Sequence, residues 1–318
     1  MKAIVVGCDL SAPSDAAIER AVGLALVQPT PAKLILVHAH GAATDVGLGE
    51  LAAGGPGPGT MDVVGQVSAA VRAAERTKLD EKRDQLGSLG LTIEIVLRSA
   101  IPPAEVLAQV ALDKHADLIV VGTHGATGIA RMLLGSVAAE TVRQAPCDVL
   151  VCRGPATRAA FAKPLVAMDF SAAASRALVH VVDLTTPDAT IEVVHAWQLP
   201  AGSWGTSFLG LQSKFPWSTV RDAVVESAKQ QAVRLAKRHA GLGRPFHVEL
   251  VQGPPASTIA HVAESGGHDL VATGTHGHRG FRRLLLGSVA DGVIRHAPCS
   301  VLVVHGEHAG ETAAFQRQ

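Results

Sequence analysis

The segment GTHGATGIARMLLGSVA, residues 122–138, returns as GTHGHRGFRRLLLGSVA at residues 274–290, an offset of 152 (274 − 122). Across residues 122–152 and 274–304, 19 of 31 positions are identical. The correspondence continues upstream at slightly different offsets, where Asp9 and Ser11 match Asp169 and Ser171. A period of about 150 residues is too long for a solenoid repeat, so the sequence indicates a duplicated domain.

The duplication predicts two domains, each of about 150 residues and each long enough to bury its own core. We expect a first domain at residues 1–153, a linker at 154–163, a second domain at 164–306 and a C-terminal tail at 307–318. The linker is placed in a short stretch with Ala, Arg and Pro between two strand patterns.

Short apolar runs alternate with helical patterns inside each copy. Helices are expected to begin at Ser11 or Ser14, after a loop at 41–60, at Pro102 and Pro103, and near Ser136. The alternation predicts an α/β fold in which each copy forms a doubly wound parallel sheet of five strands. The expected strands are 2–7, 34–39, 91–97, 118–121 and 149–152, then 165–168, 191–196, 247–251, 270–273 and 301–304.

The composition argues against several classes of protein. The 28 Lys and Arg balance the 28 Asp and Glu, and seven Phe, three Trp and no Tyr leave little for base stacking, so no nucleic-acid partner is expected. No apolar run approaches the about 18 residues of a membrane helix, and residues 3–8 are too short for a signal-peptide core. We therefore expect no membrane insertion and a cytoplasmic location. The four cysteines lack CxxC spacing and are expected to be buried, reduced thiols.

Candidate binding residues collect at the carboxyl ends of the expected strands, where an open parallel sheet binds its ligands. Asp9 follows the first strand, Ala39 ends the second, and a G-x2-G-x9-G-S motif follows the fourth in both copies. Glycine lets the backbone approach a ligand, and Ser136 could cap a helix whose free N–H groups face a phosphate. The acid could accept hydrogen bonds from a ribose or an adenine. The alternatives stay open: the glycines can be turn residues, and the acids can be turn or cap residues.

The GTHG and LLGSVA pieces, followed by Ala145-Pro-Cys147 and a terminal strand, resemble the universal stress protein family. The two copies resemble its tandem members over almost the whole chain. The resemblance implies a Rossmann-like fold of the adenine nucleotide alpha-hydrolase type, with strand order 3-2-1-4-5. It also implies that ATP, or AMP or ADP in its place, binds in the crevice, either with or without Mg²⁺. The family's frequent proline before the first acid is absent, since Gly7 and Cys8 stand there, which leaves the adenine fit open.

The resemblance also implies which residues would contact the nucleotide, and it assigns no catalytic residue and no metal ligand. In the first copy these are Asp9, Leu10, Ser11, Ala39, Gly122, His124, Gly125, Gly135, Ser136 and Val137. In the second copy they are Asp169, Phe170, Ser171, Ala196, Gly274, His276, Gly277, Arg283, Gly287, Ser288 and Val289. Arg283 is equally well explained as a solvated surface arginine.

Two other kinds of site are weighed against nucleotide binding. No GxxxxGK[ST] or G-x-S-x-G motif occurs, so at most slow ATP hydrolysis is expected. Fifteen histidines raise a metal alternative, but no ligand spacing supports it. The first places to look for a metal would be His38, His40, His124, His276 and His278, and the structural interpretation of these residues is favoured.

The function expected from the resemblance is that of a nucleotide-responsive stress regulator that acts through an unidentified protein partner. The rival hypothesis is a nucleotide-independent scaffold. Single-domain members of the family that the chain resembles commonly dimerise through strand five. The resemblance thus implies that residues 149–152 face 301–304 in an intramolecular pseudo-dimer, with a further homodimer as an alternative.

Overall fold

The computed structural model describes residues 1–40, 60–99, 102–123, 134–198, 217–275 and 286–305. The chain divides into two compact units, one running from Met1 to Ala160 and the other beginning at Phe161. Among the described residues, no helix is both long and apolar enough to cross a membrane.

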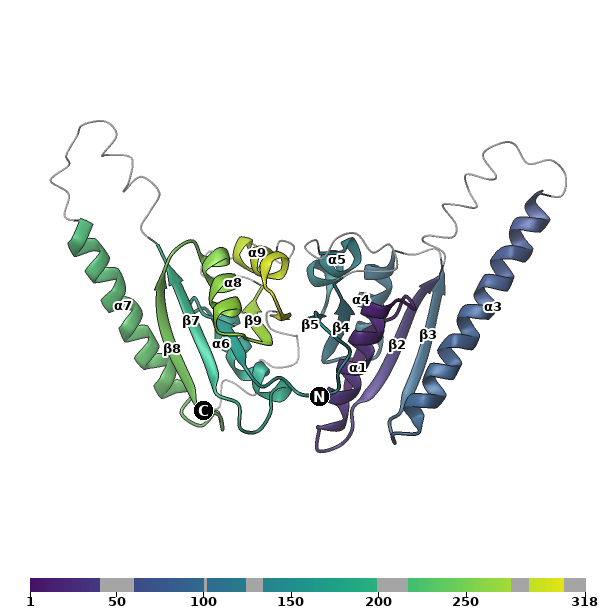
Figure 1. Ribbon diagram of the computed structural model, residues 1–318, viewed down its shortest axis with the longest axis horizontal. Helices are drawn as coiled ribbons and strands as arrows, with labels where there is room; N and C mark the ends of the chain where they lie inside the picture. Colours follow the sequence, from purple (N-terminus) through teal and green to yellow (C-terminus); the bar gives the residue numbers. More distant parts are fainter. Residues whose placement is uncertain (41–59, 100–101, 124–133, 199–216, 276–285, 306–318) are drawn as a thin grey trace. The chain divides into compact units, whose positions relative to one another are not determined.

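Strands and helices alternate along the first unit (Figure 1). Its described elements are β1 (Ala3–Gly7), α1 (Ala12–Leu26), β2 (Lys33–His40), α3 (Thr60–Gly87), β3 (Ile93–Ser99), α4 (Pro103–Asp113), β4 (Leu118–Gly122), α5 (Ser136–Gln144) and β5 (Asp148–Cys152). The strands pair in parallel in the order β3-β2-β1-β4-β5. The predicted order 3-2-1-4-5 is therefore confirmed, with β1 at the centre of the sheet.

The second unit repeats this topology. Its described elements are β6 (Pro164–Ala167), α6 (Ala172–His180), the 3-10 helix η1 (Val181–Leu184), β7 (Ile191–Trp197), α7 (Trp217–Arg238), β8 (Phe246–Gln252), α8 (Pro255–Ser265), β9 (Leu270–Gly274), α9 (Ser288–His296) and β10 (Ser300–Val304). The parallel order is β8-β7-β6-β9-β10. The predicted α/β fold class is confirmed in both units, and each predicted strand end lies within two residues of the observed end.

The central strands of the first unit form its hydrophobic core. Val6, Val120 and Leu150, from β1, β4 and β5, are fully buried. Parallel strands covered by helices on both faces appear in the sequence as continuous apolar runs, which is why the short runs predicted strands correctly. The edge strand β8 instead alternates between partly buried and exposed residues.

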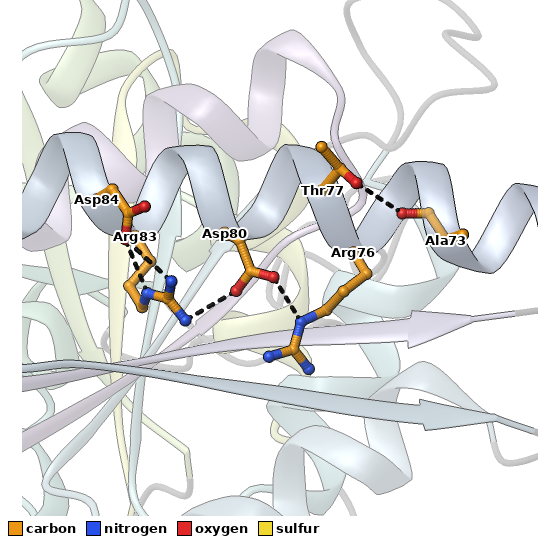
Figure 2. Close-up of polar contacts among 6 residues, drawn as sticks. All are labelled: Ala73, Arg76, Thr77, Asp80, Arg83 and Asp84. Atoms are coloured by element: carbon orange, nitrogen blue, oxygen red, sulfur yellow. Dashed lines mark hydrogen bonds and ion pairs between the residues drawn. The ribbon is translucent and has the colours of Figure 1, made fainter.

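The long helix α3 lies beside the edge strand β3 (Figure 1) and exposes a charged outer face (Figure 2). Arg76 Nε donates to Asp80 at 2.8 Å, and Arg83 contacts both Asp80, at 2.8 Å, and Asp84, at 3.0 Å. The Arg76 guanidinium lowers the pKa of the Asp80 carboxyl below its ordinary value. Leu79 is fully buried on the inner side. The helix is therefore amphipathic, with its apolar side toward the sheet.

The chain that leaves β5 packs against α1, and residues 154–160 are called the strap. Arg158 Nε lies 2.5 Å from Glu19 Oε2, and Arg20 donates to the carbonyl oxygen of Ala159. A Cβ on Gly23 would overlap the Arg158 carbonyl oxygen and lie 2.6 Å from its carbonyl carbon. Glycine at position 23 therefore permits the close approach of the strap. The domain limits expected from the sequence stay predictions.

Candidate functional site

An open cleft of about 190 Å³ lies at the carboxyl ends of β1, β2 and β4. It is lined by Gly7, Cys8, Asp9, Ser14, Val37, Ala39, Pro103, Leu107, Val121, Gly122, Thr123, Gly135, Ser136 and Val137. β1 and β4 are neighbours, and the sheet continues from β1 to β2 on one side and from β4 to β5 on the other. The cleft thus occupies the point where strand order reverses, the usual binding place in such sheets.

An acidic turn forms one end of the cleft. The exposed Asp9 carboxylate accepts the Ser11 N–H at 3.1 Å and also the Ser11 hydroxyl. Leu10 between them has a φ of 62°, a left-handed conformation that non-glycine residues rarely adopt. The second unit repeats the turn, with Asp169 Oδ1 accepting the Ser171 N–H at 2.9 Å. Each acid therefore shapes its own turn, and Asp9 also presents its carboxylate to the cleft.

The glycines that end β4 and β9 have a packing role. A Cβ on Gly122 would lie 2.8 Å from the carbonyl oxygen of Pro13 in α1. A Cβ on Gly274 would lie 2.7 Å from the Cβ of Ala173 in α6. The missing side chains leave room for these two helices, so the turn-and-packing interpretation explains both glycines, although Gly122 also lines the cleft.

The start of α5 forms the other end of the cleft. Gly135 is the N-cap, and its N–H donates to the Thr123 carbonyl at 2.7 Å. The prediction that Ser136 or Ser288 caps the helix is wrong, because Gly135 and Gly287 occupy the cap positions without a side-chain bond. Ser136 and Val137 are exposed, and the first-turn N–H groups of a helix have no intrahelical acceptor. This end of the cleft therefore suits an anion.

Matching histidines hold the residue before each acidic turn. His38 Nδ1 donates to the Cys8 carbonyl at 2.7 Å, and His195 Nδ1 donates to the Met168 carbonyl at 2.7 Å. His38 Nε2 lies 3.4 Å from a carboxylate oxygen of Glu75 in α3. Within the described part of the chain, no three His, Cys, Asp or Glu residues are placed to hold a metal ion. These contacts support the structural interpretation of His38 and His195.

The structure brings together most of the described residues that were predicted for the first site. Asp9, Ala39, Gly122, Gly135, Ser136 and Val137 all line the cleft. Leu10 instead lines a separate hollow beside α3, and Ser11 caps α1 through a 3.4 Å bond from the Ser14 N–H. The predicted contacts His124, Gly125, His276, Gly277 and Arg283, and the metal candidate His278, lie outside the described residues.

The predicted residues of the second unit stand at the corresponding ends of its elements. Ser171 caps α6 through a 3.2 Å bond from the Ala174 N–H. Asp169 and Phe170 follow β6, Ala196 lies in β7, Gly274 ends β9, and Gly287, Ser288 and Val289 begin α9.

Eight residues that line the first cleft were not predicted as site residues from sequence: Gly7, Cys8, Ser14, Val37, Pro103, Leu107, Val121 and Thr123. Burial raises the pKa of the Cys8 thiol, so this side chain lines the cleft as a neutral group. The helix that begins at Pro103 was predicted, but its packing beside the cleft depends on the way α4 crosses the sheet. An apolar residue one turn into a helix that follows a strand would be the signal for Leu107.

The family model for the universal stress protein family matches residues 1–153 and again 161–305. The chain belongs to the universal stress protein family. A universal stress protein of Mycolicibacterium smegmatis is 27% identical over 312 residues, which cover 95% of this chain and 96% of that relative. One of Methanocaldococcus jannaschii is 37% identical over 97 residues, 30% of this chain and 57% of the relative. The family and the tandem arrangement expected from the two motifs are thereby confirmed.

Solved structures agree with the fold of this universal stress protein. A universal stress protein from Archaeoglobus fulgidus has a TM-score of 0.58 at 19% identity, with 95% of this chain and 98% of that chain covered. A Pseudomonas aeruginosa protein has a TM-score of 0.64 at 17% identity, with coverages of 96% and 93%. At such identities the likeness supports the fold alone.

Proposed function

We propose that this universal stress protein binds an adenine nucleotide in the first-unit cleft and in its counterpart in the second unit. One observation carries the proposal: Asp9 and the exposed first turn of α5 line the same cleft, at the point where strand order reverses. A carboxylate can accept hydrogen bonds from ribose hydroxyls or an adenine amino group, and a helix N-terminus favours phosphate. The two ends of the cleft thus suit the two ends of a nucleotide.

The described part of the cleft would enclose one part of such a ligand and leave its phosphates at the exposed start of α5. The volume of about 190 Å³ is below the roughly 300–1,000 Å³ of typical small-molecule pockets, so phosphates would extend along the exposed residues Ser136 and Val137. Among the described lining residues, Asp9 carries the one carboxylate, and it already accepts bonds from Ser11. Mg²⁺ would therefore be held mainly by the phosphates. The same single carboxylate supports binding with at most slow hydrolysis.

In this proposal ATP is the ligand, with AMP or ADP as the alternatives, and its binding changes a surface that a regulatory protein recognises. Membership of the universal stress protein family supports a stress-response role. The cytoplasmic location, the pairing of residues 149–152 with 301–304 and a homodimer stay predictions.

Calorimetric titration of the full chain with ATP, ADP and AMP tests the proposal. Ser136→Glu adds a negative charge at an exposed first helical position, where the helix dipole tolerates it but a phosphate does not. We expect Ser136→Glu to remove binding in the first unit and Ser288→Glu to remove it in the second, while Ser136→Gln, which adds bulk without charge, retains it. The nucleotide content of a denatured extract of fresh protein is the companion measurement. An extract without nucleotide, together with no heat on titration, would overturn the proposal and favour the nucleotide-independent scaffold.

A further inference from the structure

We propose that Glu75 and His38 form a positioning pair for the Asp9 turn of the first cleft, and that the second unit lacks this pair. The inference rests on the proposed function, because it concerns the site at which the nucleotide would bind. It makes the two sites unequal: binding in the first unit depends on α3, whereas binding in the second unit does not depend on α7 in this way.

His38 fixes the peptide from which the acidic turn starts. The Cys8 N–H donates to the Val37 carbonyl at 2.9 Å, and the Cys8 carbonyl accepts from His38 Nδ1 at 2.7 Å. The backbone N–H and the backbone carbonyl of Cys8 are therefore both bonded to residues of β2, and the next residue in the chain is Asp9. Because Asp9 and Cys8 both line the cleft, a change in the orientation of the His38 ring would be transmitted to the carboxylate that faces the ligand.

Glu75 holds the opposite edge of the same ring. Its carboxylate oxygen lies 3.4 Å from His38 Nε2, and the His38 side chain is only 7% exposed. A backbone carbonyl has no proton to donate, so Nδ1 carries a hydrogen and the ring orientation is defined. An acceptor oxygen thus faces each nitrogen of the His38 ring: the Cys8 carbonyl, directly after β1, and the Glu75 carboxylate in α3. Among the described residues Nε2 makes no hydrogen bond, so Glu75 approaches it at ion-pair distance, a contact that is attractive when Nε2 also carries a hydrogen. Such outer groups commonly orient the residues that contact a ligand directly.

The second unit provides an internal comparison. On α7 an offset of 153 (228 − 75) aligns Val67, Ala70 and Val71 with the identical residues Val220, Ala223 and Val224. The same offset places Ala228 where α3 has Glu75. His195 still donates to the Met168 carbonyl. The carboxylate partner of the histidine is therefore what differs between the copies at this position.

In the second unit a hollow lies beside His195, and Ala228 stands where the first unit has Glu75. A hollow of about 400 Å³ is lined by His195, Val220, Ala223, Val224, Ser227, Ala228 and Gln231. A polar link between the long helix and the start of α1 is also replaced: Lys82 Nζ lies 2.6 Å from Asp15 Oδ1, whereas Leu235 and Ser175 stand at the matching positions. Two polar links to the cleft region thus occur in the first unit and not at the matching positions of the second.

Photolabelling of the full chain with 8-azido-ATP, competed by ATP, gives an apparent affinity for each unit when labelled peptides are assigned to residues 1–160 or 161–305 by mass spectrometry. Glu75→Gln keeps the shape of the side chain and removes its charge. We expect it to weaken ATP competition in the first unit by about three- to tenfold, the scale of a lost positioning contact, and to leave the second unit unchanged.

Two further variants separate positioning from stability. Glu81→Gln removes an exposed acid of the same helix that lines the hollow beside Leu10, and it should leave both affinities unchanged. Ala228→Glu supplies the missing carboxylate to His195 and should tighten the second site by about threefold. Amide NMR shifts of Cys8 and Asp9, recorded without nucleotide, should move in Glu75→Gln and not in Glu81→Gln.

The outcomes separate this inference from the proposed function. Labelling of neither unit in the unchanged protein would overturn the proposed function itself. ATP-competed labelling of both units that Glu75→Gln leaves unaltered would overturn the positioning role and leave the proposed function standing. An equal loss of affinity in Glu75→Gln and Glu81→Gln, or an equal loss in both units, would also overturn the positioning role.

Discussion

Replacing Gly23 with alanine is expected to displace the strap from α1. Gly23 is buried in the helix, and an added Cβ would overlap the Arg158 carbonyl oxygen and lie 2.6 Å from the carbonyl carbon and 2.8 Å from the Cα of the same residue. These are backbone atoms, which cannot rotate away as the end of a side chain can. The strap must therefore move by roughly 1 Å to restore ordinary contact distances.

Opposing terms set the size of the effect. In an unobstructed helix, alanine is more stable than glycine by about 1 kcal/mol. Against this gain, overpacking costs about 1–3 kcal/mol, the Arg20 bond to the strap contributes about 1 kcal/mol, and the exposed pair of Arg158 and Glu19 contributes at most about 1 kcal/mol. We expect a net loss of about 1–4 kcal/mol. For a unit of this size it corresponds to a fall in Tm of about 3–12 °C.

Trypsin provides the assay because it cleaves after arginine, and Arg158 lies in the strap. We expect Gly23→Ala to accelerate cleavage after Arg158 by roughly tenfold and to lower the Tm of the first unit. Gly87→Ala is the matched control, since no described atom lies within 4 Å of a Cβ at that helix end. A Gly23→Ala protein with an unchanged or higher Tm and an unchanged cleavage rate would refute the reasoning.

Three further predictions concern packing and ionisation. Gly122→Ala should lower the free energy of unfolding by about 1–3 kcal/mol in urea without nucleotide, because its Cβ would stand 2.8 Å from the Pro13 carbonyl oxygen; an unchanged midpoint would contradict this. The Lys114 ammonium lowers the pKa of the Glu94 carboxyl, so its stabilisation is present above the unfolded pKa of about 4.3 and is lost as the pH falls through the folded value. The stability difference between the unchanged protein and Glu94→Gln, at most about 1 kcal/mol at neutral pH, should vanish in acid, and a constant difference would argue against the ion pair. Burial raises the pKa of the Cys152 thiol to about 12, so iodoacetamide should label this thiol only after unfolding. The free energy of unfolding should also fall at alkaline pH, because the unfolded thiol ionises at a lower pH than the folded one. Rapid labelling of the folded chain would show that this thiol is accessible.

The fold was predictable because the central strands are buried on both faces, and burial leaves a continuous apolar run in the sequence. The prediction of the edge strand β3 was less accurate, because the strand begins at Ile93 rather than at Leu91. Its start is set by the pairing of Ile93 with Leu34 and not by the apolar content of the segment. The change from α6 to a 3-10 helix at Val181 could not be predicted, because no glycine or proline occurs in the sequence at that point.

The cleft was predictable where its residues end strands, as with Asp9 and Ala39. The capping role of Ser136 was wrong because Gly135, with φ −61° and ψ 148°, already has the extended conformation of an N-cap. The contact between His38 and Glu75 could not be predicted from local spacing, because it depends on where α3 lies against the sheet. Comparison of the two copies at this position is the sequence signal that would have drawn attention to it.

The central place of β1 in its sheet has a consequence for the synthesis of the chain. β1 pairs with β2, but its other edge is completed only when Ile4 meets Leu118 in β4. Asp117, directly before β4, accepts the N–H groups of Lys2 and Ala3. A nascent chain that has not yet reached β4 therefore holds β1 with one edge unpaired, and such edges template aggregation. Ribosomal pausing before Asp117 would prolong this exposure, whereas pausing after β5 would allow the first sheet to close before the second copy is made.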